Sequence, residues 1–472
     1  MLSVLALLAF VANALAWDGW SNDTANQVMG MNLGSYFVPE TWMMQEYTNC
    51  YAEGVDDIWG MHSLPNASDI MINHLNNFIR EVDFADAQKM GINMVRVPVA
   101  FWMFIPTEGD EPYWTDSRQK DVYLVQILNW AKKYGMEVLI DIHAMPGGQN
   151  TDAHSGRNLV AAGLLPTFLN STNLARGNAT VDAVIKWIQE LPQNISSTIA
   201  IIELVNEPSL VTADSYEALA GFYIAGQAKV AAALPNVWTM IGDAWLGVQS
   251  WGDVFSPSQK VVMDLHWWNM FANPPPTLNM LEIAYCSLSP PAAAHAWKNP
   301  ILIGEFSAVQ NNPTLYNTST KIVALEFYQS YYATQLWAAR GSGGALPLYR
   351  GGFIWNMICT NCGDVWSPYY ISGGWDSFVV TEPNWCNVTA TGTATATKPP
   401  QSAAINPTPV HDANRCGIYT TAQKNIAGTG TATSSSSTST STKKGAANGL
   451  RPSTSLLATT VLIPLVGLLQ FF

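Results

Sequence analysis

Eight short segments of the chain are apolar at nearly every position instead of alternating between apolar and polar residues. This pattern is typical of strands that are covered on both faces, as in parallel sheets. The segments are Val28–Gly34, Gly91–Pro98, Met136–His143, Ile199–Glu207, Val237–Asp243, Lys260–His266, Ile301–Phe306 and Gly352–Trp355. Between most of them, apolar residues recur with the spacing of helices. The clearest such stretches are Asn73–Met90, Asp121–Tyr134, Asp182–Glu190, Tyr216–Ala233 and Lys321–Ala339.

Strand and helix alternating about eight times predict an α/β fold, a (β/α)8 TIM barrel that forms one domain. A doubly wound open sheet is the alternative. The first predicted strand ends in Asn-Leu-Gly and no G-x-G-x-x-G turn follows it. The dinucleotide fingerprint of open sheets is therefore missing, which favours the barrel.

Polar residues interrupt the apolar segments mainly toward their carboxyl ends. They are Arg96, His143, Asn206, Glu207, His266 and Glu305. Because all strands of a barrel run in one direction, these ends meet at one face, where barrel active sites are built. An Asn-Glu-Pro tripeptide alone carries little weight. At a strand end, in company with Glu305 and two histidines, it indicates a functional site.

Two glutamates in one cleft suit glycoside hydrolysis. One carboxyl protonates the leaving oxygen, and the other attacks the anomeric carbon or activates water. Their pKa values must differ, with burial raising that of the acid and a positive neighbour such as Arg96 lowering that of its partner. The sequence has no H-E-x-x-H, P-loop or G-x-S-x-G motif, and its seven histidines are scattered. We expect no metal and no cofactor.

Nineteen tryptophans are many for a chain of this length. Tryptophan near a cleft can stack on the apolar face of a sugar ring, but it is equally suited to packing in a core. The candidates near predicted strand ends are Trp102, Trp267, Trp268, Trp355 and Trp375. For each of them both roles stay open.

Charge and the amino terminus indicate a secreted protein. The 472 residues carry a formal net charge of −13 and no basic run, which argues against a nucleic-acid partner. Residues 1–16 form an apolar run that ends in Ala-Leu-Ala, as in a signal peptide, with a buried helix as the alternative. Six cysteines then predict three disulfides of undetermined pairing. Seven N-glycosylation sequons are also consistent with secretion, at Asn22, Asn66, Asn170, Asn178, Asn194, Asn317 and Asn387.

The composition changes near the carboxyl terminus. We expect a catalytic domain over residues 17–425 and a Ser/Thr-rich stalk over 426–445. A short apolar tail after small residues and a spacer is typical of a GPI-attachment signal, so 446–472 is the expected propeptide. Gly445 is the expected attachment residue, with Ala447 as the alternative, and a plain tail anchor is the other interpretation. The predicted location is the outer face of the plasma membrane or the cell wall.

Taken together, the motifs resemble glycoside hydrolase family 5, and within it the secreted exo-β-1,3-glucanases of fungi and oomycetes. The resemblance extends from about residue 30 to 376. The motifs that carry it are G-M-N-L-G-S-Y-F-V-P-E (30–40), M-G-I-N-M-V-R-V-P-V-A-F-W (90–102), I-D-I-H-A-M-P-G-G-Q-N (140–150), E-L-V-N-E-P (203–208), D-L-H-W-W-N-M-F (264–271) and I-G-E-F (303–306).

The resemblance implies a retaining mechanism. Glu207 would be the acid/base and Glu305 the nucleophile, held ionised by Arg96. The remaining implied roles are sugar contacts: Asn206 to the 2-hydroxyl, His143 and His266 along the sugar subsite, Glu40 to the terminal glucose, and Trp355 as an aromatic floor.

Some positions depart from the family pattern. Trp268 stands where the family has a tyrosine that bonds the nucleophile, and the loop after Trp355 lacks W-K-T-E. Gly-Ser-Tyr also replaces the usual Gly-Gly-Trp near the start.

We therefore expect a monomeric enzyme that releases glucose from β-1,3-glucan of cell walls. The alternatives are a β-1,6-glucanase or another β-glycosidase, a glucan transglycosylase, and a GPI-anchored glucan-binding protein without catalysis.

Overall fold

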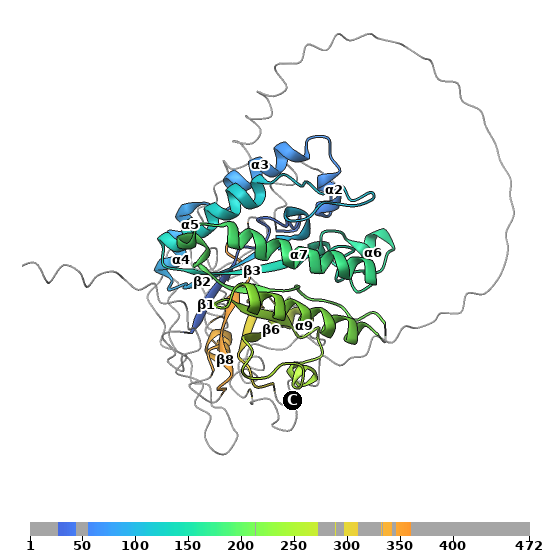
Figure 1. The fold of residues 1–472 in the computed structure, drawn as a ribbon. Coiled ribbons are helices and arrows are strands. Elements are labelled where there is room, and N and C mark those ends of the chain that lie inside the picture. Colours follow the sequence, from blue (N-terminus) through green and yellow to red (C-terminus); the bar gives the residue numbers. More distant parts are fainter. Residues whose placement is uncertain are drawn as a thin grey trace, which may run out of the picture. The chain divides into compact units, whose positions relative to one another are not determined.

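In the computed structural model, the described residues are 27–43, 55–212, 214–271, 288, 297–309, 332, 334–341 and 346–359. Within them, eight parallel strands close into a barrel in chain order, with β8 paired to β1 (Figure 1). The strands are β1 (Val28–Asn32), β2 (Met94–Ala100), β3 (Glu137–Ala144), β4 (Ile199–Glu203), β5 (Trp238–Gly242), β6 (Val261–Trp267), β7 (Ile301–Phe306) and β8 (Tyr349–Ile354). The predicted TIM barrel is confirmed.

Helices follow the strands along the chain and lie outside the barrel (Figure 1). They are α2 (Ile58–His62), α3 (Ala67–Asn77), α4 (Glu81–Lys89), α5 (Val125–Lys133), α6 (Leu159–Ala162), α7 (Ser171–Glu190), α8 (Gln193–Ser196) and α9 (Ser215–Ala233). α5 packs on β3, α9 packs on β5, and α7 contacts α9. Short helical turns complete the loops: η2 (Phe101–Met103), η3 (Gln119–Leu124), η4 (Ala153–Ser155), η5 (Val248–Trp251) and η6 (Asn269–Phe271).

The single helix predicted over Asn73–Met90 is wrong, because the chain forms α3 and α4 with a break between them. Arg80 is extended, at φ −128° and ψ 164°, and its N–H donates to Asp83 Oδ2 at 2.7 Å, which starts α4. Phe78 and Ile79 are buried in the break. The apolar spacing continues across it because both helices bury a face. The helix predicted at Asp182–Glu190 begins earlier, where Asn170 caps α7.

Two predicted strand ends also differ from the structure. β4 ends at Glu203, so Glu207 lies on the loop beyond it and not at the last strand position. Its φ of 43° is left-handed and lies outside the β region of regular strands. β2 continues to Ala100, which places Arg96 within the strand and not at its end.

The barrel interior has two layers of different chemistry. An apolar layer is formed by buried residues that include Val28, Met94, Leu139, Ile201, Met240, Val262, Leu302 and Phe353. Because alternate strand residues face the same side, the next inward position on each strand is two residues further on. On four strands that position is charged and buried: Arg96, Asp141, Glu203 and Asp264. These four, with Asn32 and Glu305, are called the charged layer below.

Several sequence predictions fall outside the described residues. They are the signal peptide 1–16, the stalk 426–445, the propeptide 446–472 with Gly445, Trp375, and the sequons at Asn22, Asn317 and Asn387. Of the helix predicted at Lys321–Ala339, the described residues 332 and 334–339 are helical. Cys359, the one cysteine among the described residues, is disulfide-bonded.

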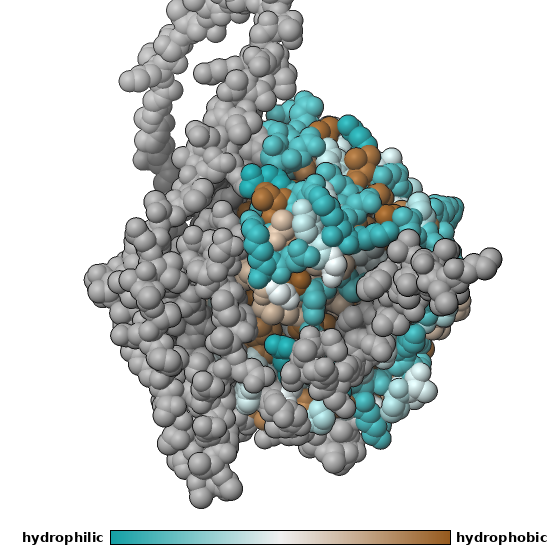
Figure 2. Space-filling model, turned by 90° about the vertical axis from the view of Figure 1, so that its left-hand side faces the viewer, coloured by the Kyte–Doolittle hydropathy of each residue, from teal (hydrophilic) through white to brown (hydrophobic). Residues whose placement is uncertain are grey.

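No helix in the described part is long and apolar enough to cross a membrane. Hydrophilic residues cover most of the described surface in Figure 2.

Candidate active site

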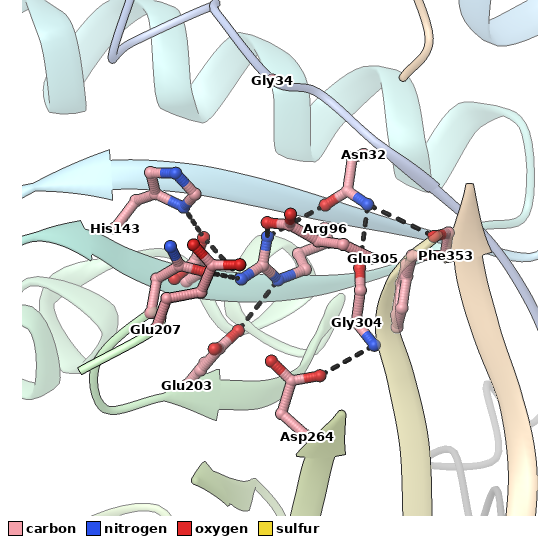
Figure 3. A network of polar contacts seen from close by, with 12 residues as sticks. Asn32, Gly34, Arg96, His143, Glu203, Glu207, Asp264, Gly304, Glu305 and Phe353 are labelled. Carbon is pink, nitrogen blue, oxygen red and sulfur yellow. Dashed lines mark hydrogen bonds and ion pairs between the residues drawn. The ribbon is translucent and has the colours of Figure 1, made fainter. Parts of the chain in front are cut away.

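The charged layer is organised around Arg96, whose side chain is completely buried (Figure 3). A guanidinium group offers five N–H donors in a rigid plane, so one arginine can hold several acceptors at once. Its partners are Glu203 Oε2 (2.8 Å), Glu305 Oε1 (2.9 Å), Asp141 Oδ2 (3.1 Å), Asn206 Oδ1 (2.7 Å) and Asn32 Oδ1 (3.1 Å). Side chains from five strands or strand-end loops are thereby held in one place.

Glu305, near the end of β7, makes the expected ion pair with Arg96. Burial nevertheless raises the pKa of Glu305 to about 8, against the lowering effects of His266 and Arg96. The positive charge of Arg96 is shared with Asp141 and Glu203, which limits how far it can favour an ionised Glu305. In the free protein, Glu305 therefore holds a proton more firmly than an exposed glutamate does.

Glu207 stands on the loop after β4 and has an imidazole at each carboxylate oxygen. Oε1 lies 2.6 Å from His266 Nδ1, and Oε2 lies 3.1 Å from His154 Nε2. Burial favours the neutral acid, but the charges and hydrogen bonds of His266 and His154 outweigh it and hold the pKa of Glu207 well below the usual 4.5. The left-handed backbone of Glu207 is uncommon for a residue other than glycine and is typical of functional sites.

His266 connects the two glutamates. Its Nδ1 lies 2.6 Å from Glu207 and 3.5 Å from Glu305 Oε2, while its Nε2 bonds Asp264 Oδ2 at 2.8 Å. Oxygens of Glu207 and Glu305 lie within 4.8 Å of each other. Retaining glycosidases hold their carboxyl groups about 5–5.5 Å apart, whereas inverting enzymes need about 6.5–9.5 Å. The short separation fits a nucleophile in contact with the sugar.

Two groups of described side chains also come close enough together to ligate a cation. They are Glu207 with His266 and Glu305, and Glu203 with Asp264 and His266. In both groups the nitrogens of His266 already bond carboxylates, and Arg96 bonds two of the glutamates. A metal would have to break these pairs, so the donor set fits a proton-sharing site better than a metal site.

Among the buried polar atoms that have no hydrogen-bond partner in the described part of the chain, two belong to residues that the sequence predicts as sugar contacts: Glu40 Oε1 and Asn206 Nδ2. The other oxygen of Glu40 accepts from Trp42 Nε1 at 2.9 Å. Burial raises the pKa of Glu40 to about 6, and its charge interacts with those of Glu207 and His154. A buried polar atom without a partner is costly, so these two atoms are candidates for contacts with a ligand hydroxyl.

His143 and Trp355 form one wall of the site. His143 Nδ1 lies 2.6 Å from Asp141 Oδ2, and its ring stacks with Trp355 at 5.9 Å and 16° between planes. Both side chains are buried. Trp268, in place of the family tyrosine, is half-buried directly after β6.

Two other tryptophan candidates pack in the core. Trp102 is buried and stacks on Tyr113 at 3.9 Å, and Trp267 is also buried. A ligand-binding role for either is not supported.

Two residues that the sequence did not single out belong to the site: His154 on η4 and Trp245 after β5. Trp245 is 50% exposed, and its ring meets His266 edge-on at 6.3 Å. Its left-handed backbone is held by the Asp243 carboxylate, which accepts its N–H at 2.9 Å. A small pocket there is lined by Glu207, Gly242, Asp243, Ala244, Trp245, Asp264 and His266. The position of Trp245 just beyond an apolar strand was the available signal for it.

The chain is similar in sequence and in fold to known proteins. Residues 65–343 match the family model "Cellulase (glycosyl hydrolase family 5)". "Probable glucan 1,3-beta-glucosidase A" of Aspergillus niger is 29% identical over 325 residues, which cover 67% of this chain and 74% of that protein. "Probable glucan 1,3-beta-glucosidase" of Arthroderma benhamiae is 29% identical over 302 residues, 61% of this chain and 67% of the relative.

Among solved structures, a rutinosidase from Aspergillus niger superposes with a TM-score of 0.62 at 19% identity. The match covers 74% of this chain and 98% of the rutinosidase chain, which shows a shared fold.

Proposed function

The chain belongs to glycosyl hydrolase family 5 and is a retaining glycosidase; from this premise we propose that it cleaves β-1,3-glucan and releases glucose from non-reducing ends. The observation that carries the proposal is the pair of Glu207 and Glu305, with oxygens within 4.8 Å, on a barrel face that also presents unpartnered acceptors and donors. The names of the curated relatives support the β-1,3 linkage.

In the first step, Glu305 attacks the anomeric carbon while Glu207 donates a proton to the leaving oxygen. The glycosidic bond breaks, and a bond from C1 to a Glu305 oxygen forms. Glu305 must be ionised for this attack, and Arg96 and His266 at 2.9 and 3.5 Å stabilise that carboxylate. The proton has to be on Glu207 at the same moment, which is the reverse of the distribution in the free protein.

In the second step, Glu207 acts as a base. It takes a proton from water, the water oxygen attacks C1, and the bond to Glu305 breaks. The left-handed backbone of Glu207 places its carboxyl on the loop side of the cleft, whereas Glu305 comes from within β7. The separation of the two carboxyl groups, and not the elements that carry them, is what a double displacement requires.

The unpartnered atoms of Glu40 and Asn206 are the proposed contacts of the sugar that will be released. Asn206 is anchored through its Oδ1 to Arg96, so its Nδ2 is free to donate to a hydroxyl beside C1. Glu40 would bind the hydroxyls of a terminal glucose, which favours release of single sugars from chain ends. Trp245, exposed beside the acid/base Glu207, offers an apolar face to the leaving part of the chain.

The test uses the purified protein with laminarin, a β-1,3-glucan, and pustulan, a β-1,6-glucan, with products followed over time. Early glucose alone from laminarin supports the proposal. Early oligosaccharides would leave the roles of the two glutamates in place but indicate attack within the chain. Activity on pustulan alone would also leave those roles in place but change the substrate to β-1,6-glucan. Longer chains in the presence of acceptor sugar indicate transglycosylation. Binding without hydrolysis would contradict the enzymatic proposal and favour a glucan-binding protein.

We also propose that the protein acts as a monomer outside the cell, held by a GPI anchor on Gly445. The apolar terminal tail after small residues supports the anchor. Treatment of intact cells with a phosphatidylinositol-specific phospholipase C should release the protein. Retention on the membrane would favour a plain tail anchor, and free secretion from untreated cells would contradict both.

A further inference from the structure

The two imidazoles that contact Glu207 differ in what surrounds them. His266 has carboxylate oxygens at both nitrogens, from Asp264 at 2.8 Å and Glu207 at 2.6 Å, with Glu305 at 3.5 Å. A ring whose two nitrogens both face carboxylates is held in its doubly protonated form. His266 therefore supplies a fixed positive charge and two donors, and it has no nitrogen on which to accept a proton from Glu207.

His154 is placed differently, because its Nε2 faces an acceptor and a donor at once. The acceptor is Glu207 Oε2 at 3.1 Å, and the donor is Asn150 Nδ2 at 2.9 Å. The Asn150 amide is oriented by two further bonds: its Oδ1 accepts from Asp152 N at 3.0 Å, and its Nδ2 donates to Glu207 O at 3.0 Å. The side of Asn150 that faces His154 is therefore the donor side.

This arrangement has two consistent proton distributions. When His154 is charged, Nε2–H donates to the Glu207 carboxylate. When Glu207 is neutral, its Oε2–H and the Asn150 Nδ2–H share the single Nε2 lone pair of a neutral His154 in a three-centre hydrogen bond. The two forms differ only by the movement of one proton across 3.1 Å. Only the second form satisfies the Asn150 donor at Nε2, and it is the form in which Glu207 can act as an acid.

We propose that His154 is a positioning residue that shares one proton with Glu207 and returns it to the acid form for each turnover. The inference rests on the proposed roles of Glu207 and Glu305. The ring of His154 is partly exposed to the cleft, with 18% of its side chain accessible, so it can also exchange this proton with water. The charged groups around it are Glu207, Glu305, Glu40, Asp152 and His143.

Counted from the form in which Glu305 is ionised, the protons balance over the cycle. Before glycosylation the pair of His154 and Glu207 holds one shared proton. That proton leaves on the departing oxygen, so the pair becomes a neutral imidazole and a carboxylate. In the second step the attacking water gives a proton to Glu207, and the pair regains its single proton. Raised proton affinity of His154 accompanies the geometry: although burial opposes it, Glu207 raises the pKa of His154 to about 9.

The kinetic test compares wild type and His154→Asn on two aryl β-glucosides. Phenyl β-glucoside needs a proton on its leaving oxygen, whereas 2,4-dinitrophenyl β-glucoside does not. Loss of a shared acid proton should lower kcat/KM on the phenyl substrate by about 10–100-fold and on the dinitrophenyl substrate by less than about threefold. In the pH profile of kcat/KM for the phenyl substrate, the alkaline limb should also move to lower pH. Equal losses on both substrates, with an unshifted limb, would overturn the proposal.

Asp152→Asn is the matched control, because it removes an exposed charge next to His154 without a contact to Glu207. The ratio of kcat/KM between the two substrates should change by no more than about twofold. The alkaline limb of the pH profile should move by no more than a few tenths of a pH unit. A shift as large as that of His154→Asn would mean that local charge alone explains the effect, and would contradict proton sharing.

A second measurement does not depend on activity. NMR titration of the His154 imidazole should give a pKa well above 6.5 in wild type, and a value close to 6.5 in Glu207→Gln, which keeps the shape but not the charge. An unchanged pKa would overturn the proposal even if the enzyme is active. If wild type hydrolyses neither glucoside, the proposed function fails, while the titration still decides whether the two groups share a proton.

Discussion

The two layers inside the barrel are built on the same strands and have opposite chemistry. On β2, β3, β4 and β6, an apolar residue faces inward first, and a charged residue occupies the same face two positions later. Met94 precedes Arg96, and Leu139 precedes Asp141. The apolar layer needs only contact and volume, whereas every member of the charged layer needs a partner. One barrel thus separates the part that stabilises it from the part that reacts.

The difference also shows why the charged layer is costly to bury. One buried arginine serves three carboxylates, so the layer as a whole would be negative if all were ionised. Burial raises the pKa of Glu203 well above its usual value, against the pull of Arg96. Protonation of buried carboxyl groups, more than ion pairing, therefore lowers the cost of burying this layer.

The largest effect should come from Glu305→Gln. Removing the nucleophile should lower kcat by on the order of 10⁴-fold or more, while the free energy of unfolding stays the same or rises, because a buried carboxyl is removed. Hydrolysis of laminarin and thermal unfolding would be measured together. Glu190→Gln, a surface change, should alter neither. Near-wild-type turnover in Glu305→Gln would refute the assignment of the nucleophile.

Arg96→Met should break the charged layer itself. Glu203, Glu305 and Asp141 lose a common partner, which we expect to cost about 3–5 kcal/mol in the free energy of unfolding and to abolish activity. Denaturant unfolding would measure the loss. Arg118→Met offers a matched comparison, because its ion pair with Asp116 is exposed and should cost at most about 1 kcal/mol. Equal costs for the two variants would show that the buried network adds no stability.

Leu139→Ala tests the apolar layer on the strand that carries Asp141. The cavity should cost about 2–5 kcal/mol, with kcat retained within a few fold in the protein that remains folded. Leu139→Met, which keeps the volume, should cost less than about 1.5 kcal/mol. A drop in kcat as large as that of the charged-layer variants would mean that the two layers are not separable.

The smallest effect is expected for Glu137→Gln at the start of β3, at the end of the barrel away from the active site. Burial raises the pKa of Glu137 from 4.5 to about 7. A carboxyl with a raised folded pKa costs no stability below pH 4.5, and its cost grows as pH rises to about 7. The glutamine variant should therefore gain about 1–3 kcal/mol at pH 8 and nothing at pH 4, as measured by unfolding at both values. A gain in the free energy of unfolding at pH 4 would contradict burial of the Glu137 carboxylate as the cause.

Much of the fold and the site could be predicted from the chain. Continuous apolar segments identified all eight strands, and the polar residues near their ends identified Arg96, His143, Asn206, Glu207, His266 and Glu305, which the structure brings together. Boundaries were harder, since Phe78 and Ile79 keep the apolar spacing through the break between α3 and α4. No periodicity pointed to His154 or Trp245, because His154 lies on the short helical turn η4 and Trp245 on the loop after β5, and the positions of such connections depend on distant contacts.

Strand periodicity and the order of elements are local properties of the chain, and they were enough to predict the barrel and the end of it at which the polar side chains are presented. Which groups of the site hold a proton follows, in contrast, from the folded protein. The pKa values of Glu207, Glu305 and His154 depend on burial and on partners from other strands, such as Asp264, Arg96 and Asn150. Electrostatic interactions act through space over a few ångströms, and the chain brings these groups together only when the barrel closes.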